Sequence, residues 1–240
     1  SENPFGRRII SLNSINWLRV MGQVSYYVWL TKQFTAPVNV AIPSGNFGNA
    51  YSAWFGRNHG LKINEILCST NVNDVLRRFI DGGVLEPFVT QPSVAPSMDI
   101  QIPSSLERLI FDLSSDAKSF YGQLQTNSKA QLDEKSINGL QNVFSSFSFS
   151  DESITTLIQS LHDEFALVFD PHSVTSIQMA LDNDSSLPTV AVATASPEKF
   201  GNVIAPLING FTESKIEEKE EYLTLSTENA EIIEAILAFI

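Results

Sequence analysis

Apolar residues recur at helical spacing near the beginning of the chain. One face of this segment carries Ile15, Leu18, Met21, Val24, Val28 and Trp29. Spacings of three and four residues place such side chains on one side of a helix. Asn13 and Ser14, which precede the pattern, are residue types that cap helix starts. The pattern therefore predicts one long amphipathic helix over residues 14–34.

Further along, short apolar runs alternate with segments of helical pattern. The runs, which we interpret as strands, are residues 38–42, 63–68, 165–169 and 189–193. The segments interpreted as helices are residues 50–59, 74–80, 106–113, 153–162, 173–181 and a helix that opens at Pro197. Strands and helices that alternate in this way predict βαβ units, and therefore an α/β fold with a mostly parallel sheet.

Two stretches interrupt this alternation. Residues 84–104 carry four prolines and are expected to be irregular, and residues 114–150 are rich in Ser, Asn and Gln and are interpreted as mobile helices. We expect residues 1–113 and 164–240 to form one α/β domain that closes with a C-terminal helix. Residues 114–163 are expected to be a helical polar insert in that domain.

A turn with two glycines joins the first predicted strand to the helix that follows it. Its sequence is Pro43-Ser44-Gly45-Asn46-Phe47-Gly48-Asn49. Free backbone N–H groups and the helix dipole favour an anion at such a helix start. We expect Gly45 and Gly48 to let the backbone turn sharply and approach that anion. The loop has no lysine and matches neither nucleotide-binding fingerprint, so it predicts either a backbone cradle for a small phosphate or a tight turn without a ligand.

The charge balance limits the choice of ligands. The chain has 15 Lys and Arg against 27 Asp and Glu, a net charge of -12, which argues against nucleic acid and against an anionic membrane surface. No segment approaches the roughly 20 apolar residues of a membrane span. The single cysteine, Cys68, excludes an internal disulfide and is expected to be a buried structural thiol. These features favour the cytoplasm.

Two further positions are candidates for ligand contacts. Thr194 ends the last predicted strand, where its hydroxyl could meet a ligand, although Ser196 and Pro197 beside it are also a common helix start. His172, in Asp170-Pro171-His172-Ser173, is either part of a helix entry or a ligand to substrate or phosphate. The three histidines have no metal-ligand spacing, so no metal site is expected.

Seven motifs, taken in order, resemble the C-terminal half of threonine synthase. They are residues 13–17 (NSINW), 43–49 (PSGNFGN), 70–74 (TNVND), 78–83 (RFIDGG), 96–101 (PSMDIQ), 170–173 (DPHS) and 194–200 (TASPEKF). Each motif is weak by itself, but the ordered set is specific and covers most of residues 9–205.

This resemblance implies a fold-type-II pyridoxal-phosphate enzyme, a three-layer sandwich whose N-terminal part is missing here. The activity that it implies is a carbon–oxygen lyase reaction, the conversion of O-phospho-L-homoserine and water into L-threonine and phosphate. The cofactor-binding residues that it implies are Gly45, Asn46, Phe47, Gly48, Asn49 and Thr194. The substrate-binding residues that it suggests are Asn13, Ser14, Asn16 and His172. The loop would hold the cofactor phosphate, and Thr194 would hydrogen-bond the pyridine nitrogen.

The chain also departs from the family pattern. Ser196 stands where the family usually has His, and Asn49 replaces a common acidic residue. The Schiff-base lysine of the family is expected upstream of Ser1, and no lysine in this chain has its sequence context. We therefore expect no catalytic residue here, no activity without the N-terminal half, and self-association of the chain. The alternatives are a non-catalytic phosphate- or pyridoxal-phosphate-binding homologue that acts as an interaction protein, and a related enzyme with another phosphorylated amino-acid substrate.

Overall fold

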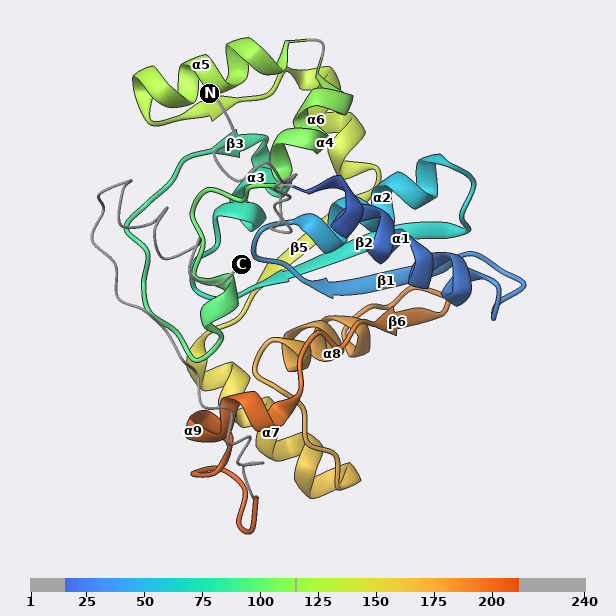
Figure 1. Ribbon diagram of the computed structural model, residues 1–240, viewed down its shortest axis with the longest axis vertical. Helices are drawn as coiled ribbons and strands as arrows, with labels where there is room; N and C mark the ends of the chain where they lie inside the picture. The colour runs from blue at the N-terminus through green and yellow to red at the C-terminus, as the bar shows by residue number, and fades with distance from the viewer. Residues whose placement is uncertain (1–15, 115, 212–240) are drawn as a thin grey trace, which may run out of the picture. The chain divides into compact units, whose positions relative to one another are not determined.

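A four-stranded sheet forms the centre of the protein. The computed structural model describes residues 16–114 and 116–211, all of which belong to one compact unit (Figure 1). The strands, in sheet order, are β5 (Phe144–Ser148), β2 (Ile63–Thr70), β1 (Val38–Pro43) and β6 (Thr189–Ala191). All three strand pairs are parallel, which confirms the expected α/β fold.

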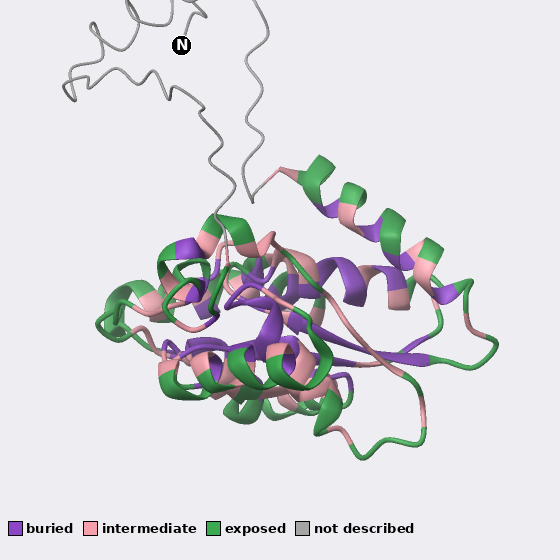
Figure 2. Ribbon diagram, turned by 90° about the horizontal axis from the view of Figure 1, so that it is seen from below, coloured by how far each residue is buried: buried purple, intermediate pink, exposed green. Residues whose placement is uncertain are grey.

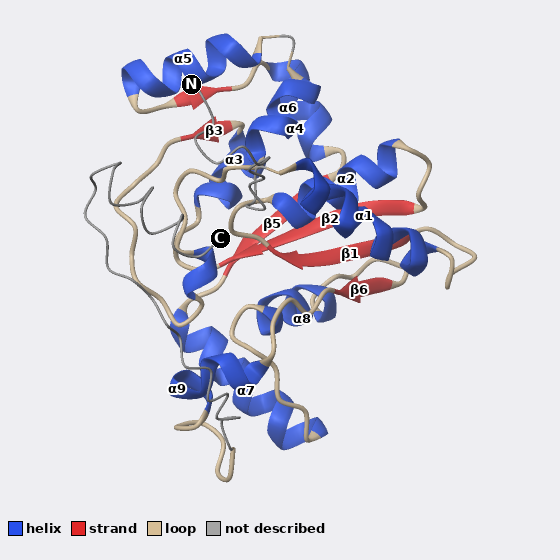
Figure 3. Cartoon of the chain, viewed as in Figure 1, coloured by secondary structure: helices blue, strands red, loops and turns tan. Residues whose placement is uncertain are grey.

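The order of the strands places helices on both faces of the sheet. From β1 the chain passes through α2 (Gly48–Asn58) to β2 and through α3 (Val75–Gly82) towards β5, in one direction across the sheet. It then returns through α8 (Ser173–Leu181) to β6, on the other side of β1. Because such crossovers are right-handed, the reversal puts α8 on the face opposite α2 and α3 (Figure 3).

The reversal has a consequence for binding. Where adjacent parallel strands send their following segments in opposite directions, a crevice forms beyond their carboxyl ends. In this sheet the two adjacent strands at which the direction reverses are β1 and β6. The helix α1 (Trp17–Thr31) packs against α2 and therefore lies on the side of the loop that follows β1.

Burial follows the two layers of helices. One apolar cluster joins β1 and β2 to α1, α2 and α3, and includes Val40, Ile66 and Phe79. A second cluster joins α7 (Asp151–Phe165) to α8 and includes Ile158 and Val174. Figure 2 shows the buried residues concentrated along the sheet and on the helix faces that cover it.

The remaining elements surround this centre. They are α4 (Leu106–Leu113), α5 (Ala117–Asn127), α6 (Glu134–Gln141), α9 (Gly201–Ile204), the antiparallel pair β3 (Val84–Leu85) and β4 (Ala130–Gln131), and the 3-10 turns η1 (Pro96–Met98) and η2 (Pro197–Phe200). No helix in the described part of the chain combines the length and the apolarity that a bilayer span requires.

Two strand assignments differ from the expectation. The strand expected at residues 165–169 is absent, because α7 continues to Phe165 and Ala166 then ends it in a left-handed conformation. Conversely, residues 144–148 form β5, which pairs with β2 along its whole length. The range 114–163 therefore contributes a strand to the central sheet and is not purely helical. The domain boundaries themselves stay a prediction, and the expected C-terminal helix lies outside the described residues.

Candidate functional site

The loop after β1 leads directly into the N-terminus of α2, as expected. The residue that turns the backbone is Phe47, which has a φ of 67° and is the N-cap of α2. A left-handed residue that is not glycine costs about 1–2 kcal/mol. The ring of Phe47 is buried, and its centroid lies 5.5 Å from that of Phe144 in β5. Packing of this ring against the sheet offsets the strain.

The sharp turn expected at the two glycines of the loop is not made by them. Neither Gly45 nor Gly48 has a positive φ. A Cβ atom on Gly45 would collide with the carbonyl oxygen of Ser97 and would lie 3.3 Å from the Cα of Met98. Gly45 is therefore required because the turn η1 packs directly against the loop.

A cavity of about 300 Å³ opens over this loop. Its lining comprises residues 43–50 and three residues of α1, namely Arg19, Val20 and Gln23. Arg19 is exposed and supplies a positive charge that the loop itself lacks. Sequence reasoning missed Arg19, because only the packing of α1 on α2 brings it to the loop. The cavity thus combines a helix N-terminus with a guanidinium group, a combination suited to an anion.

A second cavity, of about 420 Å³, adjoins the first. It is lined by Gln23, Tyr26, Asn49, Val192, Ala193 and Thr194. Gln23 and Asn49 line both cavities, so the two spaces meet at these side chains. The structure thereby brings the loop after β1 and the strand end at Thr194 to one site, at the crevice between β1 and β6.

Asn49 is fixed by two tyrosines of α1. Its Oδ1 accepts hydrogen bonds from the hydroxyls of Tyr26 at 2.7 Å and Tyr27 at 2.5 Å. Burial raises the pKa of Tyr26 to about 12 and raises the pKa of Tyr27 well above its ordinary value. Both hydroxyls therefore stay protonated donors at neutral pH, and they hold the amide at the boundary between the two cavities.

Thr194 is held through its backbone. Its N–H donates to Oγ of Ser173 at 2.9 Å, and this hydroxyl in turn donates to Oδ2 of Asp170. Asp170 is completely buried. Burial by itself raises the pKa of Asp170, but hydrogen bonds from His172 and Ser173 outweigh it and hold the pKa below the ordinary value. The carboxylate is thus kept ionised inside the protein.

His172 is buried, with both ring nitrogens hydrogen-bonded. Nδ1 lies 2.9 Å from Oδ1 of Asp170, and Nε2 accepts a hydrogen bond from the N–H of Ser97 at 3.1 Å. Because Nε2 is an acceptor, the proton of the neutral ring sits on Nδ1 and points at the carboxylate. These contacts are those of a structural histidine, and a role for His172 as a substrate ligand stays a prediction without support from them.

The polar residues after β2 bind a carboxylate of the protein itself. Nδ2 of Asn71 and Nδ2 of Asn73 donate to Oδ1 of Asp99 at 2.7 and 3.0 Å, and Ser93 donates to the same oxygen. This cluster is anchored at the carboxyl end of β2, and it fixes the segment that contains η1. It therefore supports the backbone that packs on Gly45.

The other candidate residues are placed as follows. Asn16 is the N-cap of α1, and its Oδ1 accepts a hydrogen bond from the N–H of Leu18 at 2.9 Å. The sequence predicts this cap at Asn13 or Ser14. Both of these residues lie outside the described part of the chain. Ser196 donates to Oε2 of Glu198 at 2.6 Å and lines neither cavity.

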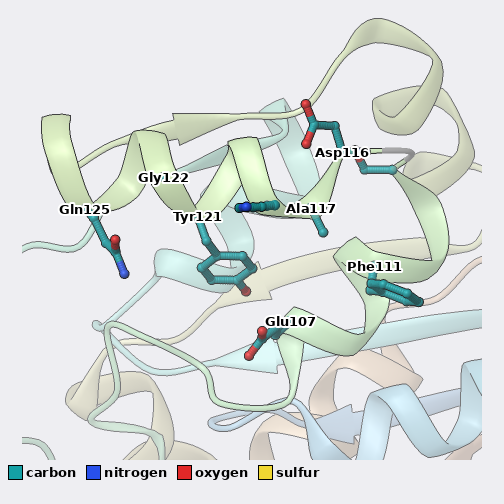
Figure 4. A pocket seen from close by; sticks show the side chains of 9 residues that line it. Glu107, Phe111, Asp116, Ala117, Tyr121, Gly122 and Gln125 are labelled. Atoms are coloured by element: carbon teal, nitrogen blue, oxygen red, sulfur yellow. The ribbon is translucent and has the colours of Figure 1, made fainter.

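A larger cavity, of about 750 Å³, lies between α4 and α5 (Figure 4). Glu107, Tyr121 and Gln125 are among its lining residues. None of the candidate residues lines it, and although Lys118 is in its wall, so are the carboxylates of Glu107 and Asp116, which disfavour an anion. We therefore place the candidate site at the two smaller cavities.

Comparison with known proteins identifies the family. A threonine synthase from Pseudomonas aeruginosa is 30% identical in an alignment of 243 positions, which covers 95% of this chain and 52% of that protein. The crystal structure of a PLP-bound threonine synthase from Brucella melitensis superposes with a TM-score of 0.85 at 28% identity, over 95% of this chain and 52% of the other. The chain belongs to the threonine synthase family. No family model matches it.

A second solved structure of this family agrees. The threonine synthase from yeast superposes with a TM-score of 0.79 at 29% identity, over 93% of this chain and 49% of the other. The chain thus spans about half the length of the curated threonine synthases and solved structures that it matches. This share is consistent with the expected correspondence to one half of a threonine synthase.

Proposed function

We propose that this chain forms the cofactor-phosphate side of a pyridoxal-phosphate-dependent threonine synthase. The observation that carries the proposal is the pair of adjacent cavities that share Gln23 and Asn49 in their walls, with the loop at residues 43–49 at one end and Thr194 at the other. A related structure of the same fold contains PLP. The two cavities together offer an anion cradle and, beside it, space lined by Val192 and Ala193 for a flat ring.

The residues present fit this cofactor. The N-terminus of α2 and Arg19 line the same cavity. Positive charge gathered there would let a chain with a net charge of -12 hold a phosphate. Thr194 would meet the pyridine nitrogen with a hydroxyl, a neutral partner that does not enforce protonation of the ring. Gln23 and Asn49, shared by both cavities, would contact the junction between ring and phosphate.

The cofactor, when bound, serves as the electron sink that such a lyase reaction requires. The chain's own residues would bind and orient it: the loop and Arg19 would hold the phosphate, and the Thr194 hydroxyl would bond the pyridine nitrogen at the other end. No lysine lines either cavity in the described part of the chain. We therefore propose that the Schiff-base lysine comes from a polypeptide that corresponds to the other half of the relatives, and that O-phospho-L-homoserine is the substrate of the assembled enzyme.

Binding to the chain by itself tests the cofactor site. Equilibrium dialysis should detect pyridoxal phosphate bound more tightly than pyridoxal, since the phosphate supplies much of the affinity. Arg19→Gln should weaken binding of pyridoxal phosphate about ten-fold, the effect of one charge-assisted hydrogen bond. Lys62→Gln, which removes a positive charge remote from the cavities, is the matched control. Equal binding of pyridoxal and pyridoxal phosphate would contradict the proposal.

Reconstitution tests the catalytic part. The chain alone should release no phosphate from O-phospho-L-homoserine, and addition of a polypeptide that carries the other half of a related threonine synthase should restore release. The alternative, a non-catalytic binding homologue, is favoured by the lack of a lysine at the cavities. It predicts that cofactor binding persists while no added half gives activity.

A further inference from the structure

A buried hydrogen-bond network connects the two ends of the candidate site. It is centred on Asp170, which lies in the segment before α8 and is completely buried. One branch runs from Asp170 through Ser173 to Thr194, and the other runs through His172 to Ser97. The two branches start from different oxygens of one carboxylate.

The first branch reaches the ring end of the site. Oγ of Ser173 donates to Oδ2 of Asp170 and accepts the N–H of Thr194 at 2.9 Å. Thr194 follows β6 closely, and its side chain is exposed in the second cavity. Since only the backbone N–H of Thr194 is engaged by Ser173, this contact fixes the strand end and leaves the Thr194 hydroxyl to face the cavity.

The second branch reaches the phosphate end. Nδ1 of His172 lies 2.9 Å from Oδ1 of Asp170, and Nε2 accepts the N–H of Ser97 at 3.1 Å. The carbonyl of Ser97 in turn packs against the Cα of Gly45, so closely that no side chain fits there. His172 therefore fixes the backbone against which the loop rests.

We propose that Asp170, His172 and Ser173 are positioning residues that hold the phosphate loop and the Thr194 strand end in one geometry, through the two oxygens of a single buried carboxylate. The proposal rests on the proposed function for its meaning, because it assigns these residues to the two ends of the cofactor. The network itself is a property of the free chain. It gives His172 and Asp170 a role at the site although neither residue lines a cavity.

The cofactor-free chain allows the first test. Amide hydrogen exchange, followed by NMR residue by residue, reports the hydrogen bonds of the Ser97 and Thr194 amides. Ser173→Ala should speed exchange of the Thr194 amide and leave the Ser97 amide unchanged. In His172→Asn the side-chain amide nitrogen can replace Nδ1 but nothing replaces Nε2. This variant should therefore speed exchange of the Ser97 amide and leave the Thr194 amide unchanged. Each affected amide should exchange about five-fold faster, the effect of one lost hydrogen bond. Asp170→Asn should accelerate both amides.

His172→Gln serves as the conservative variant. Its side-chain oxygen can accept the N–H of Ser97 in place of Nε2 and should restore slow exchange at that amide. Ser136→Ala, a buried serine on α6 that bonds Asp133 and the Leu113 carbonyl, controls for general loss of stability and should change neither amide. If every variant accelerated exchange of both amides equally, these residues would act only through general stability. That result would overturn the proposal.

Ligand binding gives the second test. His172→Asn should lower the affinity for both inorganic phosphate and pyridoxal phosphate by about five-fold, while Ser173→Ala should lower only the affinity for pyridoxal phosphate. If the native chain binds neither ligand, the proposed function fails, and the exchange pattern alone then decides the network. If both ligands bind and the two variants lose affinity equally for each, the proposed division between the ends is wrong.

Discussion

Gly45 occupies the tightest backbone contact of the candidate site. Ser97, whose carbonyl faces it, is itself held by His172, so this neighbour cannot easily move away. Gly22, by contrast, is exposed on α1 with open space around the position of a Cβ atom. The two glycines therefore form a matched pair in which only one is required by packing.

Gly45→Ala should destabilise the protein by about 1–3 kcal/mol, the usual range for overpacking in a rigid environment. Gly22→Ala should stabilise it by about 0.5–1 kcal/mol, because alanine loses less conformational freedom in a helix. Urea unfolding followed by circular dichroism measures both changes. If the two substitutions had the same sign, the backbone contact with Ser97 would not constrain the loop.

Asp170 should give the protein a specific dependence on acid. Its pKa in the folded protein lies below the ordinary value, so its carboxylate contributes stability that is complete above the unfolded pKa of about 3.9. This contribution is lost as the pH falls through the folded pKa. The stability difference between the native protein and Asp170→Asn should therefore be largest above about pH 4 and shrink at lower pH.

Urea titrations at several pH values measure this difference. Asp163→Asn is the control, because Asp163 is largely exposed and its carboxylate lies beside the neighbouring His162. It should leave the acid dependence almost unchanged. A difference for Asp170→Asn that stayed constant down to acid pH would show that the carboxylate is not ionised in the folded protein.

Sequence reasoning at the scale of single residues succeeded for local turns and failed for contacts between distant segments. The loop at residues 43–49 was recognisable because its turn and its flanking elements are adjacent in the chain. Arg19 could not be assigned, since its place at the loop depends on how α1 packs on α2. Phe47 was missed as the left-handed residue because its strain is offset by a ring contact with Phe144, almost a hundred residues away.

At the scale of elements, β2 is one of the two inner strands of the sheet. It pairs with β1 on one side and β5 on the other, and it carries Cys68, which is fully buried. Burial raises the pKa of the Cys68 thiol to about 12. The thiol is therefore both inaccessible and protonated at physiological pH, as expected for a structural cysteine.

Cys68 should resist thiol reagents in the folded protein. At pH 8 only about one thiol in ten thousand would be ionised, and reagent access requires opening of the central sheet. Labelling with an aromatic disulfide should be slow under native conditions and rapid in denaturant. Fast native labelling would mean that β2 separates from its neighbours well below the global unfolding free energy.

Two elements show why strand prediction from composition was incomplete. Residues 165–169 are apolar, yet Phe165 completes α7, and Val168 and Phe169 instead pack against the cluster formed with α8. A strand needs a neighbouring edge for its hydrogen bonds, and this segment has none. Residues 144–148 contain three serines and look polar, but they face the available edge of β2 and form β5.

At the scale of the whole molecule, the described part of the chain exposes apolar surface. Leu18 and Trp29 on α1 are each 65% exposed. In addition, β5 and β6 are the outer strands of the sheet, each paired on one side only within the described residues. Unpaired edges and large exposed side chains favour association with other chains.

We expect the chain to self-associate when it is alone in solution. Sedimentation velocity at increasing concentration should show a rise in mean mass, and the double variant Leu18→Glu, Trp29→Lys should reduce it. Val89→Glu, at another exposed apolar position, is the control for a general effect of surface charge. A chain that stays monomeric across the concentration range would refute this expectation.

The pairing of β1 with β6 bears on how the protein is made. Nδ2 of Asn39 donates to Oγ1 of Thr189 across 150 residues of chain. At the usual 5–20 residues per second, a ribosome needs roughly 8 to 30 seconds to add that length. Throughout this interval the nascent chain carries the loop at residues 43–49 beside an edge of β1 that has not yet met β6. That edge stays open to pairing with other strands until the segment that bears Thr194 is translated.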